Sequence, residues 1–288
     1  MSIKIVSDSS SNVFSIPGAN YATVPMKVVA GDTEFVDTPE LDLQGMVDFL
    51  KNYKSKSGSS CPNVQEFVDA FGDGQEDIFG LTISKALSGS YNAAQQAAQI
   101  YLEEHPERKV FIIDTKSAGP QQIMLVEKLQ QLIEEGLDFD TIKEKIQEYQ
   151  NNTHILFCLE SLTNLARNGR INPAVAKIAG AIGMRVCGDV KNGQITPVHK
   201  PRGQKKATQV LVEMMKERGF YDGAILRIAH CFGEAQAKAL GDAVLAQFPN
   251  TRLIIEPTTA LCSFYAEAGG LMIGFEGGYN ENNNNKDS

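Results

Sequence analysis

The sequence has no apolar run that approaches the roughly 20 residues needed to cross a bilayer. The opening run from Met1 to Val6 is short and strand-like and ends at Asp8, far short of a signal-peptide core. With no targeting or spanning segment in view, we expect the protein to reside in the cytoplasm.

Cysteine is sparse and unpaired in the sequence. The five cysteines are an odd number, are widely dispersed and include no Cys-x-x-Cys pair. This pattern excludes a disulfide scaffold and a typical zinc site, so we expect no bound metal. The thiols are expected to be mostly buried and inert. They are Cys61, Cys158, Cys187, Cys231 and Cys262.

Positive charge is also in deficit. The chain has 27 basic and 35 acidic residues, a formal net charge of −8, and a pI near 5.1. This balance argues against nucleic acid or an anionic membrane as the main partner.

Three signatures of catalysis and cofactor binding are missing: the Gly-x4-Gly-Lys-Ser/Thr phosphate loop, the Gly-x-Gly-x-x-Gly fingerprint and the Gly-x-Ser-x-Gly elbow. Nucleotide or dinucleotide binding therefore lacks its usual signature, and the missing elbow weakens the case for an α/β-hydrolase, so we expect no cofactor.

The first half of the sequence alternates strand patterns with helix patterns. The predicted strands are residues 3–6, 23–29, 78–83 and 110–113, and the predicted helices are residues 43–53, 64–71, 92–104, 121–134 and 139–151. Pro62 is expected to open the second of these helices. Such alternation predicts a mostly parallel sheet with helices on both faces.

The pattern restarts after residues 151–152. A helical stretch over 162–182, two short strands around Asn192-Gly193, and further helices and strands up to residue 275 predict a second α/β unit. The Asn-Gly pair is a strong signal for a type I′ β-hairpin. A chain of 288 residues suits two domains, which we place at 1–152 and 153–278, followed by a disordered polar tail at 279–288.

Hydroxyl-rich segments follow several predicted strands. Residues 8–11, 84–90 and 114–119 come after strands, and residues 57–60 precede a helix. Ligands of open parallel sheets bind beyond the carboxyl ends of the strands. Hydroxyls, glycine and helix N-terminal amides together suit a small anionic group. Each segment alone is better explained by helix caps and turns, but four such segments together favour a binding site.

Other side chains leave an alternative open. Asp8, Asp114 or His230 would serve a small-molecule hydrolase or phosphotransferase, and each is also explained by an ordinary structural role. Arg170 follows a glycine in a turn, where it suits either a carboxylate partner or a solvated surface.

Five short motifs together resemble the DegV family, the FakB-type fatty-acid-binding proteins of bacteria. The first are Ile-Val-Ser-Asp-Ser-Ser at residues 5–10 and Ser-Ser-Cys-Pro-Asn at 59–63. Leu-Ser-Gly-Ser-Tyr at 87–91 and Asp-Thr-Lys-Ser-Ala-Gly at 114–119 follow. The last is Leu-Ala-Arg-Asn-Gly-Arg-Ile at 165–171, with a basic segment at 200–207. Their order and spacing extend the resemblance over nearly the whole chain.

The resemblance implies a two-domain DegV-like fold that holds one fatty acid in an apolar tunnel at the domain interface. Carried over residue by residue, it implies that Ser59 and Ser88, with Gly89 close by, hold the carboxylate. Ser60 adjoins this site, and Arg170 lies near its exit. It also implies a partner, a FakA-type kinase that phosphorylates the bound acid, so this chain would be a carrier and not an enzyme.

This sequence departs from the family pattern at two places. Cys61 stands where the family has glutamine before proline, and the C-terminal His-Thr-Gly-Pro-Gly segment is absent. We expect Cys262 or Ser263 to take the place of the family histidine, and we count Asp8 and Ser9 as further candidates from the opening motif.

Overall fold

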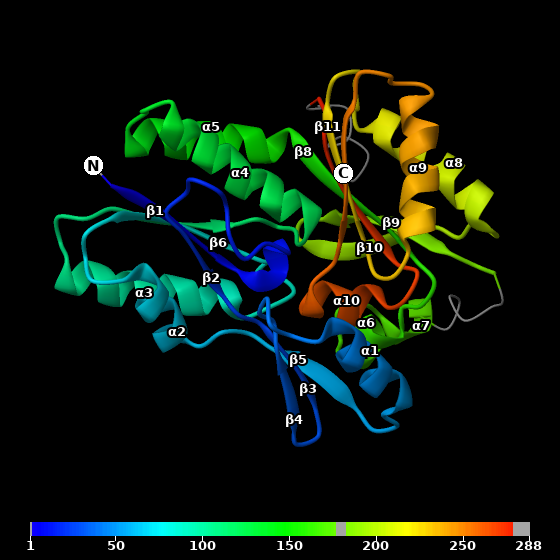
Figure 1. Ribbon diagram of the computed structural model, residues 1–288, viewed down its shortest axis with the longest axis horizontal. Coiled ribbons are helices and arrows are strands. Elements are labelled where there is room, and N and C mark those ends of the chain that lie inside the picture. The colour runs from blue at the N-terminus through cyan, green and yellow to red at the C-terminus, as the bar shows by residue number, and fades with distance from the viewer. Residues whose placement is uncertain (1, 177–182, 279–288) are drawn as a thin grey trace.

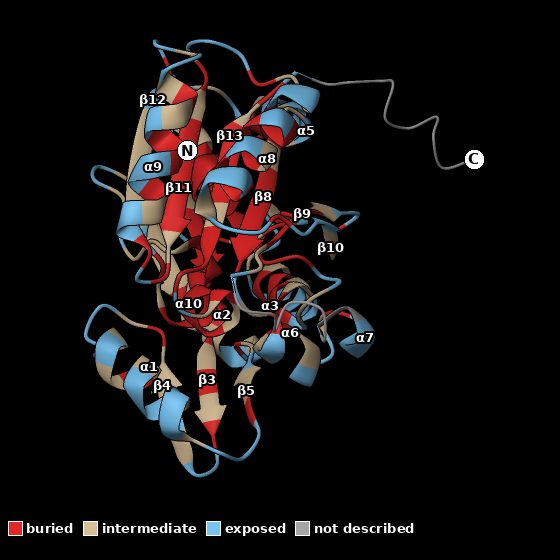
Figure 2. Ribbon diagram, turned by 90° about the vertical axis from the view of Figure 1, so that its right-hand side faces the viewer, coloured by how far each residue is buried: buried red, intermediate tan, exposed pale blue. Residues whose placement is uncertain are grey.

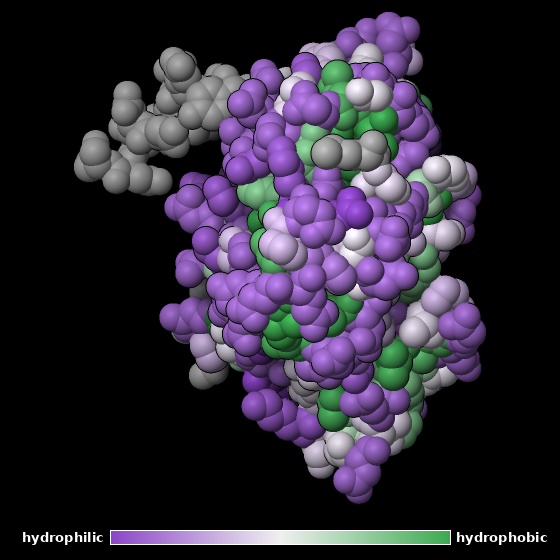
Figure 3. Space-filling view, turned by 90° about the vertical axis from the view of Figure 1, so that its left-hand side faces the viewer, coloured by the Kyte–Doolittle hydropathy of each residue, from purple (hydrophilic) through white to green (hydrophobic). Residues whose placement is uncertain are grey.

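The computed structural model describes residues 2–176 and 183–278. Its strands form two larger sheets and one small sheet, flanked by helices (Figure 1). Buried residues concentrate in the strands, and the outer helices carry the exposed positions (Figure 2). Hydrophilic side chains cover most of the face drawn in Figure 3, with apolar side chains showing between them in separate areas. None of the described helices is long and apolar enough to span a membrane.

The first sheet is entirely parallel and has the strand order β2-β1-β6-β7. Its strands are β1 (Ile3–Asp8), β2 (Tyr21–Val24), β6 (Asp77–Thr82) and β7 (Val110–Asp114). The helices on its two faces are α2 (Val64–Phe71) with α3 (Ser90–Glu104), and α4 (Pro120–Glu134) with α5 (Phe139–Asn151) (Figure 1). Because successive strand residues face opposite sides, Ile5 packs under α4 and α5 while Val6 packs against α2 and α3. The predicted parallel α/β arrangement is confirmed.

The second sheet is mixed, with the order β10-β9-β8-β13-β11-β12. Within it only β11 and β12 run parallel to each other. Its strands are β8 (Thr153–Leu159), β9 (Val186–Lys191), β10 (Gln194–His199), β11 (Ile225–His230), β12 (Arg252–Pro257) and β13 (Leu271–Glu276). Helices α8 (Gln204–Glu217) and α9 (Glu234–Leu245) pack on one face, and α4 packs on the other. Helix α4 therefore lies between the two larger sheets.

A glycine permits this close packing of α4 on the second sheet. A Cβ at Gly274 of β13 would come within 2.7 Å of the carbonyl carbon of Pro120, the first residue of α4. The contact brings the start of α4, and the loop before it, to the middle of the molecule.

The third sheet is small and antiparallel, with the order β4-β3-β5. Its strands are β3 (Lys27–Ala30), β4 (Thr33–Val36) and β5 (Ser57–Ser60), and it packs against α1 (Leu43–Asn52) and α10 (Ala260–Ala266). Val28, Met46 and Phe264 share one core there, so a helix from the end of the chain packs on strands from its beginning. The change of sheet after α5 coincides with the expected boundary at 152/153, but because of this shared core the two-domain division stays a prediction.

Three local predictions were wrong. The single strand expected over 23–29 is two strands, because the chain passes at Pro25 from the first sheet to the third. Residues 57–60, expected at a helix start, form β5. Pro62 lies outside α2, whose N-cap is Asn63 in a capping box with Glu66.

The hairpin prediction is confirmed. Asn192 and Gly193 have φ values of 50° and 79°, as a type I′ turn requires, and they join β9 to β10. The helical stretch expected over 162–182 contains α6 (Thr163–Arg167) and α7 (Pro173–Ala176). Its residues 177–182 and the predicted tail at 279–288 lie outside the described residues.

Candidate functional site

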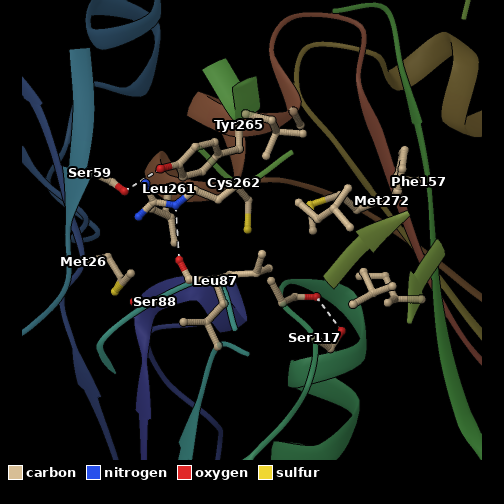
Figure 4. Close-up of a pocket in the computed structure, with 18 of the residues that line it drawn as sticks. Met26, Ser59, Leu87, Ser88, Ser117, Phe157, Leu261, Cys262, Tyr265 and Met272 are labelled. Atoms are coloured by element: carbon tan, nitrogen blue, oxygen red, sulfur yellow. Dashed lines mark hydrogen bonds between the residues drawn. The ribbon is translucent and has the colours of Figure 1, made fainter. Parts of the chain in front are cut away.

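A cavity of about 340 Å³ lies where the three sheets meet (Figure 4). The first sheet contributes the loops after β6 and β7, the third sheet contributes β5, and the second contributes β8, β9, β10 and β13. Helix α10, helix α6 with the turn after it, and Met26 between β2 and β3 complete the described wall. The volume falls within the range of about 300–1,000 Å³ typical of small-molecule pockets.

The polar side chains of the cavity gather at one end. The hydroxyl oxygens of Ser59 and Tyr265 share a hydrogen bond of 2.7 Å. The guanidinium carbon of Arg170 lies 6.0 Å from the centroid of the Tyr265 ring, and Arg170 Nε donates to the carbonyl of Leu87 at 3.2 Å. Ser88 follows Leu87 directly. These groups come from four parts of the chain: β5, α10, the turn after α6, and residues 87–89 before α3, which we call the α3 entry.

Helix α3 begins at this polar end. Ser88 Oγ accepts a hydrogen bond of 3.2 Å from the amide of Ser90, the first residue of α3, which leaves its own proton free to donate. Gly89 is the N-cap residue, and a Cβ there would lie 3.3 Å from Cys61 Sγ, so glycine allows the α3 entry and β5 segment to pack closely. The helix N-terminus adds amide donors and a positive dipole end.

The rest of the cavity is apolar. Along β8, alternate residues Ile155, Phe157 and Leu159 line it, while Leu156 and Cys158 face the opposite core. Figure 4 shows Phe157 and Met272 on the side of the cavity away from Ser59 and Tyr265. The site thus has one polar end and a long apolar body.

Most of the predicted site residues line this cavity. Ser59, Ser60, Ser88, Gly89, Arg170 and Cys262 all do so. Of the four hydroxyl-rich segments, three contribute lining residues, and the third of them does so through Ser117 and Ala118. The segment at 8–11 lies behind the wall.

Asp8, Ser9 and Ser263 are not brought to the cavity. Ser263 is 2% exposed and its hydroxyl shares a 2.7 Å hydrogen bond with Thr258 Oγ1. Ser9 Oγ donates to Asp37 Oδ2 at 2.8 Å. All three are buried residues that hydrogen-bond to other parts of the chain, and none of them lines the cavity.

Asp8 is fully buried at the end of β1 and ties the first sheet to two helices. It accepts hydrogen bonds at 2.5–3.0 Å from Ser10, Ile83, Ser90 and Gln122. Burial raises the pKa of Asp8 above its ordinary value, and these hydrogen bonds oppose the rise. Since Ser90 begins α3, this network holds the Ser88-Gly89 entry in place.

The sequence reasoning missed Asp37, a second buried carboxylate. Asp37 accepts from the amides of Ala260 at 2.8 Å and Leu261 at 3.3 Å, the first residues of α10. Burial raises its pKa, and hydrogen bonds from α10 and Ser9 work against that rise. No local signal identifies Asp37, because its partners on α10 lie more than 200 residues along the chain.

Tyr265 was also missed. Cys262 or Ser263 was expected to take the place of the family histidine. The Cys262 thiol donates to the carbonyl of Ser10 at 3.6 Å, and burial raises its pKa, so it stays neutral. Tyr265 instead presents a hydroxyl to Ser59. A usable signal existed: Tyr265 lies one helical turn after Cys262, which places both on one face of α10.

The alternative set of Asp8, Asp114 and His230 is not assembled at the cavity. None of the three is among the residues that line it. Asp114 forms an ion pair of 3.6 Å with Lys85, and burial lowers the pKa of His230. The described structure therefore supplies no joint arrangement of these groups around a ligand.

Comparison with known proteins gives one consistent picture. The model of the family described as "Uncharacterised protein, DegV family" matches residues 2–276. A DegV domain-containing protein of Streptococcus gordonii is 38% identical over 281 residues, which cover 96% of this chain and 99% of the relative.

Two solved structures are similar over 96% of this chain and 100% of theirs, each with a TM-score of 0.93. One, 37% identical, is a DegV family protein from Eubacterium eligens loaded with heptadecanoic acid. The other, 36% identical, is the Streptococcus pneumoniae Fatty Acid Kinase (Fak) B3 protein loaded with linoleic acid.

Proposed function

The chain belongs to the DegV family, and from that premise we propose that it binds one fatty acid in the cavity between its sheets. The observation that carries the proposal is the division of the cavity into one polar end and a long apolar body. Two similar proteins, 36% and 37% identical, are loaded with linoleic and heptadecanoic acid.

The apolar body suits the acyl tail. Each buried methylene contributes about 0.8 kcal/mol, so a tail that fills the cavity supplies most of the affinity. A polar ligand would find no hydrogen-bond partner among the lining side chains of Ile83, Phe157, Leu261 and Met272. Affinity therefore comes from the tail, and orientation comes from the head group.

The polar end suits the carboxylate. Arg170 supplies a positive charge, and Ser88 supplies a hydroxyl donor near the positive end of the α3 dipole. Ser59 and Tyr265 share one hydrogen bond, so this pair has one further hydroxyl proton to donate. Several converging donors with one cation offset the cost of removing a carboxylate from water. We assign the carboxylate to these four side chains, with Gly89 providing close backbone approach.

In this proposal the chain is a carrier and not an enzyme. A separate kinase of the FakA type would phosphorylate the carboxylate presented at the Arg170 end, in the cytoplasm. The similarity to the Fak B3 protein, which is named for a fatty acid kinase, supports this assignment of roles. A panel of ester and phosphate substrates tests it, because a carrier should turn over none of them.

The purified protein is expected to carry fatty acid. Mass spectrometry of an organic extract of the denatured protein should show about one straight-chain acid per chain, and delipidated protein should bind added oleate in native mass spectrometry. A protein that yields no fatty acid and also ignores added oleate would contradict the proposal.

The reactivity of Cys61 toward an alkylating agent reports whether the cavity is occupied. It lines the cavity and is partly exposed, whereas the other four cysteines are buried. Alkylation requires an accessible thiol, so iodoacetamide should modify Cys61 in the empty protein, and bound oleate should slow that reaction at least tenfold.

The control is a Cys61→Ser variant, which should show almost no labelling in either state. Peptide mapping after labelling identifies the modified residue. Equal labelling rates with and without oleate would place the ligand elsewhere.

A further inference from the structure

A second, polar pocket lies directly beyond the apolar end of the fatty-acid cavity. It has a volume of about 170 Å³ and is lined by Lys116, Gln121, His154, Asp189 and Arg218, among others. We call it the distal polar pocket. Ile155 and Val190 line both this pocket and the cavity, so these two side chains form the partition between them.

The partition lies at the far end of the cavity from the proposed carboxylate site. Leu159 packs in one cluster with Leu165 and Tyr265, next to the polar end. Ile155 is four residues earlier on β8 and on the same face, which places it roughly 13 Å away at about 3.3 Å per residue. Val190 reaches the same place from β9, where it pairs across the hairpin with Ile195, which also lines the cavity.

Two contacts hold the partition in position. The hairpin turn is held against the loop after β6 by a 2.8 Å hydrogen bond from Ser84 Oγ to the carbonyl of Gly193. The start of β8 is held against α4, because Gln121 Nε2 donates to the carbonyl and hydroxyl of Thr153 at 2.9 and 3.0 Å. These hydrogen bonds hold the backbone close to Val190 and to Ile155, the two residues of the partition.

The space beyond the partition is unsuited to an acyl chain. Asp189 is 4% exposed and pairs with Arg218 through one oxygen, while its other oxygen and His154 Nε2 have no hydrogen-bond partner among the described residues. A terminal methyl group in contact with such atoms would leave them unpaired, which is unfavourable.

From this arrangement we propose that Ile155 and Val190 set the upper limit of acyl-chain length. The inference rests on the proposed fatty-acid binding and specifies its substrate class: straight-chain acids whose terminal methyl group stops at this partition. Below the limit each added methylene is buried and raises affinity about fourfold. Above the limit the tail must fold back or enter the distal polar pocket, so the gain stops.

The test measures affinity for saturated straight-chain acids that differ by two carbons, using delipidated full-length protein. Wild-type affinity should rise with length and then level off or fall; we call the chain length at which it stops rising the break. In Ile155→Ala and Val190→Ala the break should move to longer acids by at least two carbons. In Val190→Phe it should move to shorter acids. Circular dichroism checks that each variant is folded, and the alanine variants decide the question if Val190→Phe is not.

Leu165→Ala is the matched control, because Leu165 lines the cavity near its polar end and takes no part in the distal polar pocket. It should weaken all acids without moving the break. If the wild type binds acids but the break is the same in both alanine variants, this inference is wrong and the proposed function stands. If the wild type binds no acid of any length, both are wrong.

Discussion

Replacing Arg170 with glutamine is expected to weaken the binding of a free fatty acid by roughly ten- to a hundredfold, because hydrogen bonds to charged groups contribute about 1.5–3 kcal/mol. Arg170 lines the polar end of the cavity and has N–H groups left after its bonds to the carbonyls of Leu87 and Asn168. Isothermal titration calorimetry with delipidated protein would measure the loss.

Two controls separate the charge of Arg170 from its structural role. The methyl ester of the same acid has no charge, so its affinity should change little in Arg170→Gln. Arg167→Gln alters an exposed arginine of the same segment that does not line the cavity, and it should leave both affinities unchanged. An equal loss for acid and ester would show that Arg170 acts only by holding the turn.

Replacing Asp8 with alanine is expected to lower the free energy of unfolding by about 3 kcal/mol near neutral pH, since buried donors left without an acceptor each cost about 1–3 kcal/mol. The donors that lose this acceptor are the amide of Ile83, the hydroxyl of Ser90 and the side-chain amide of Gln122. Ser10 also bonds to Asp8, but its hydroxyl keeps a second acceptor, Gln122 Oε1, at 2.7 Å. Some of this cost is offset because a desolvated carboxylate is removed. Urea unfolding followed by circular dichroism would measure the change.

The effect of Asp8→Ala should also depend on pH in a defined direction. Burial raises the pKa of Asp8 above 3.8, its ordinary value. Between pH 3.8 and the raised pKa, Asp8 therefore keeps its proton in the folded protein but loses it in the unfolded chain. The contribution of Asp8 to stability therefore falls as pH rises through this interval. The difference between wild type and variant should be largest at acid pH and smaller toward neutral pH, because the other titrating groups are common to both.

Asp42→Ala is the control for this prediction. Asp42 is an exposed N-cap that accepts one hydrogen bond from the amide of Gly45 at 2.9 Å. Its loss should destabilise the protein less than the loss of Asp8. Equal losses, or a difference between wild type and Asp8→Ala that grows with pH, would contradict the role assigned to the Asp8 network.

The Asp8 and Asp37 networks explain how the site is held without either carboxylate touching the cavity. Asp8 anchors the start of α3 through Ser90, and Asp37 accepts from the first amides of α10. Tyr265 of α10 and Ser88, two residues before α3, lie at the polar end. We infer that Asp8→Ala, besides its effect on stability, lowers affinity for acid and ester alike.

Local sequence determined the parallel first sheet, the helices around it and the hairpin at Asn192-Gly193. These features depend on periodicity and turn chemistry within a few residues, which a single sequence displays directly. Ser59, Ser88 and Gly89 were predicted by resemblance, and hydroxyl groups after strands had already indicated this edge of the first sheet.

Only the tertiary structure decided the features that join distant segments. The break at Pro25, β5, the hydrogen bond between Ser59 and Tyr265, and the acceptor role of Asp37 each depend on partners in another sheet or on α10. The partition of Ile155 and Val190 is of the same kind, because an apolar residue that ends a cavity has the same composition as one that fills a core. Sequence periodicity reports which face of an element is apolar, and three-dimensional packing alone decides whether that face meets a side chain or a ligand.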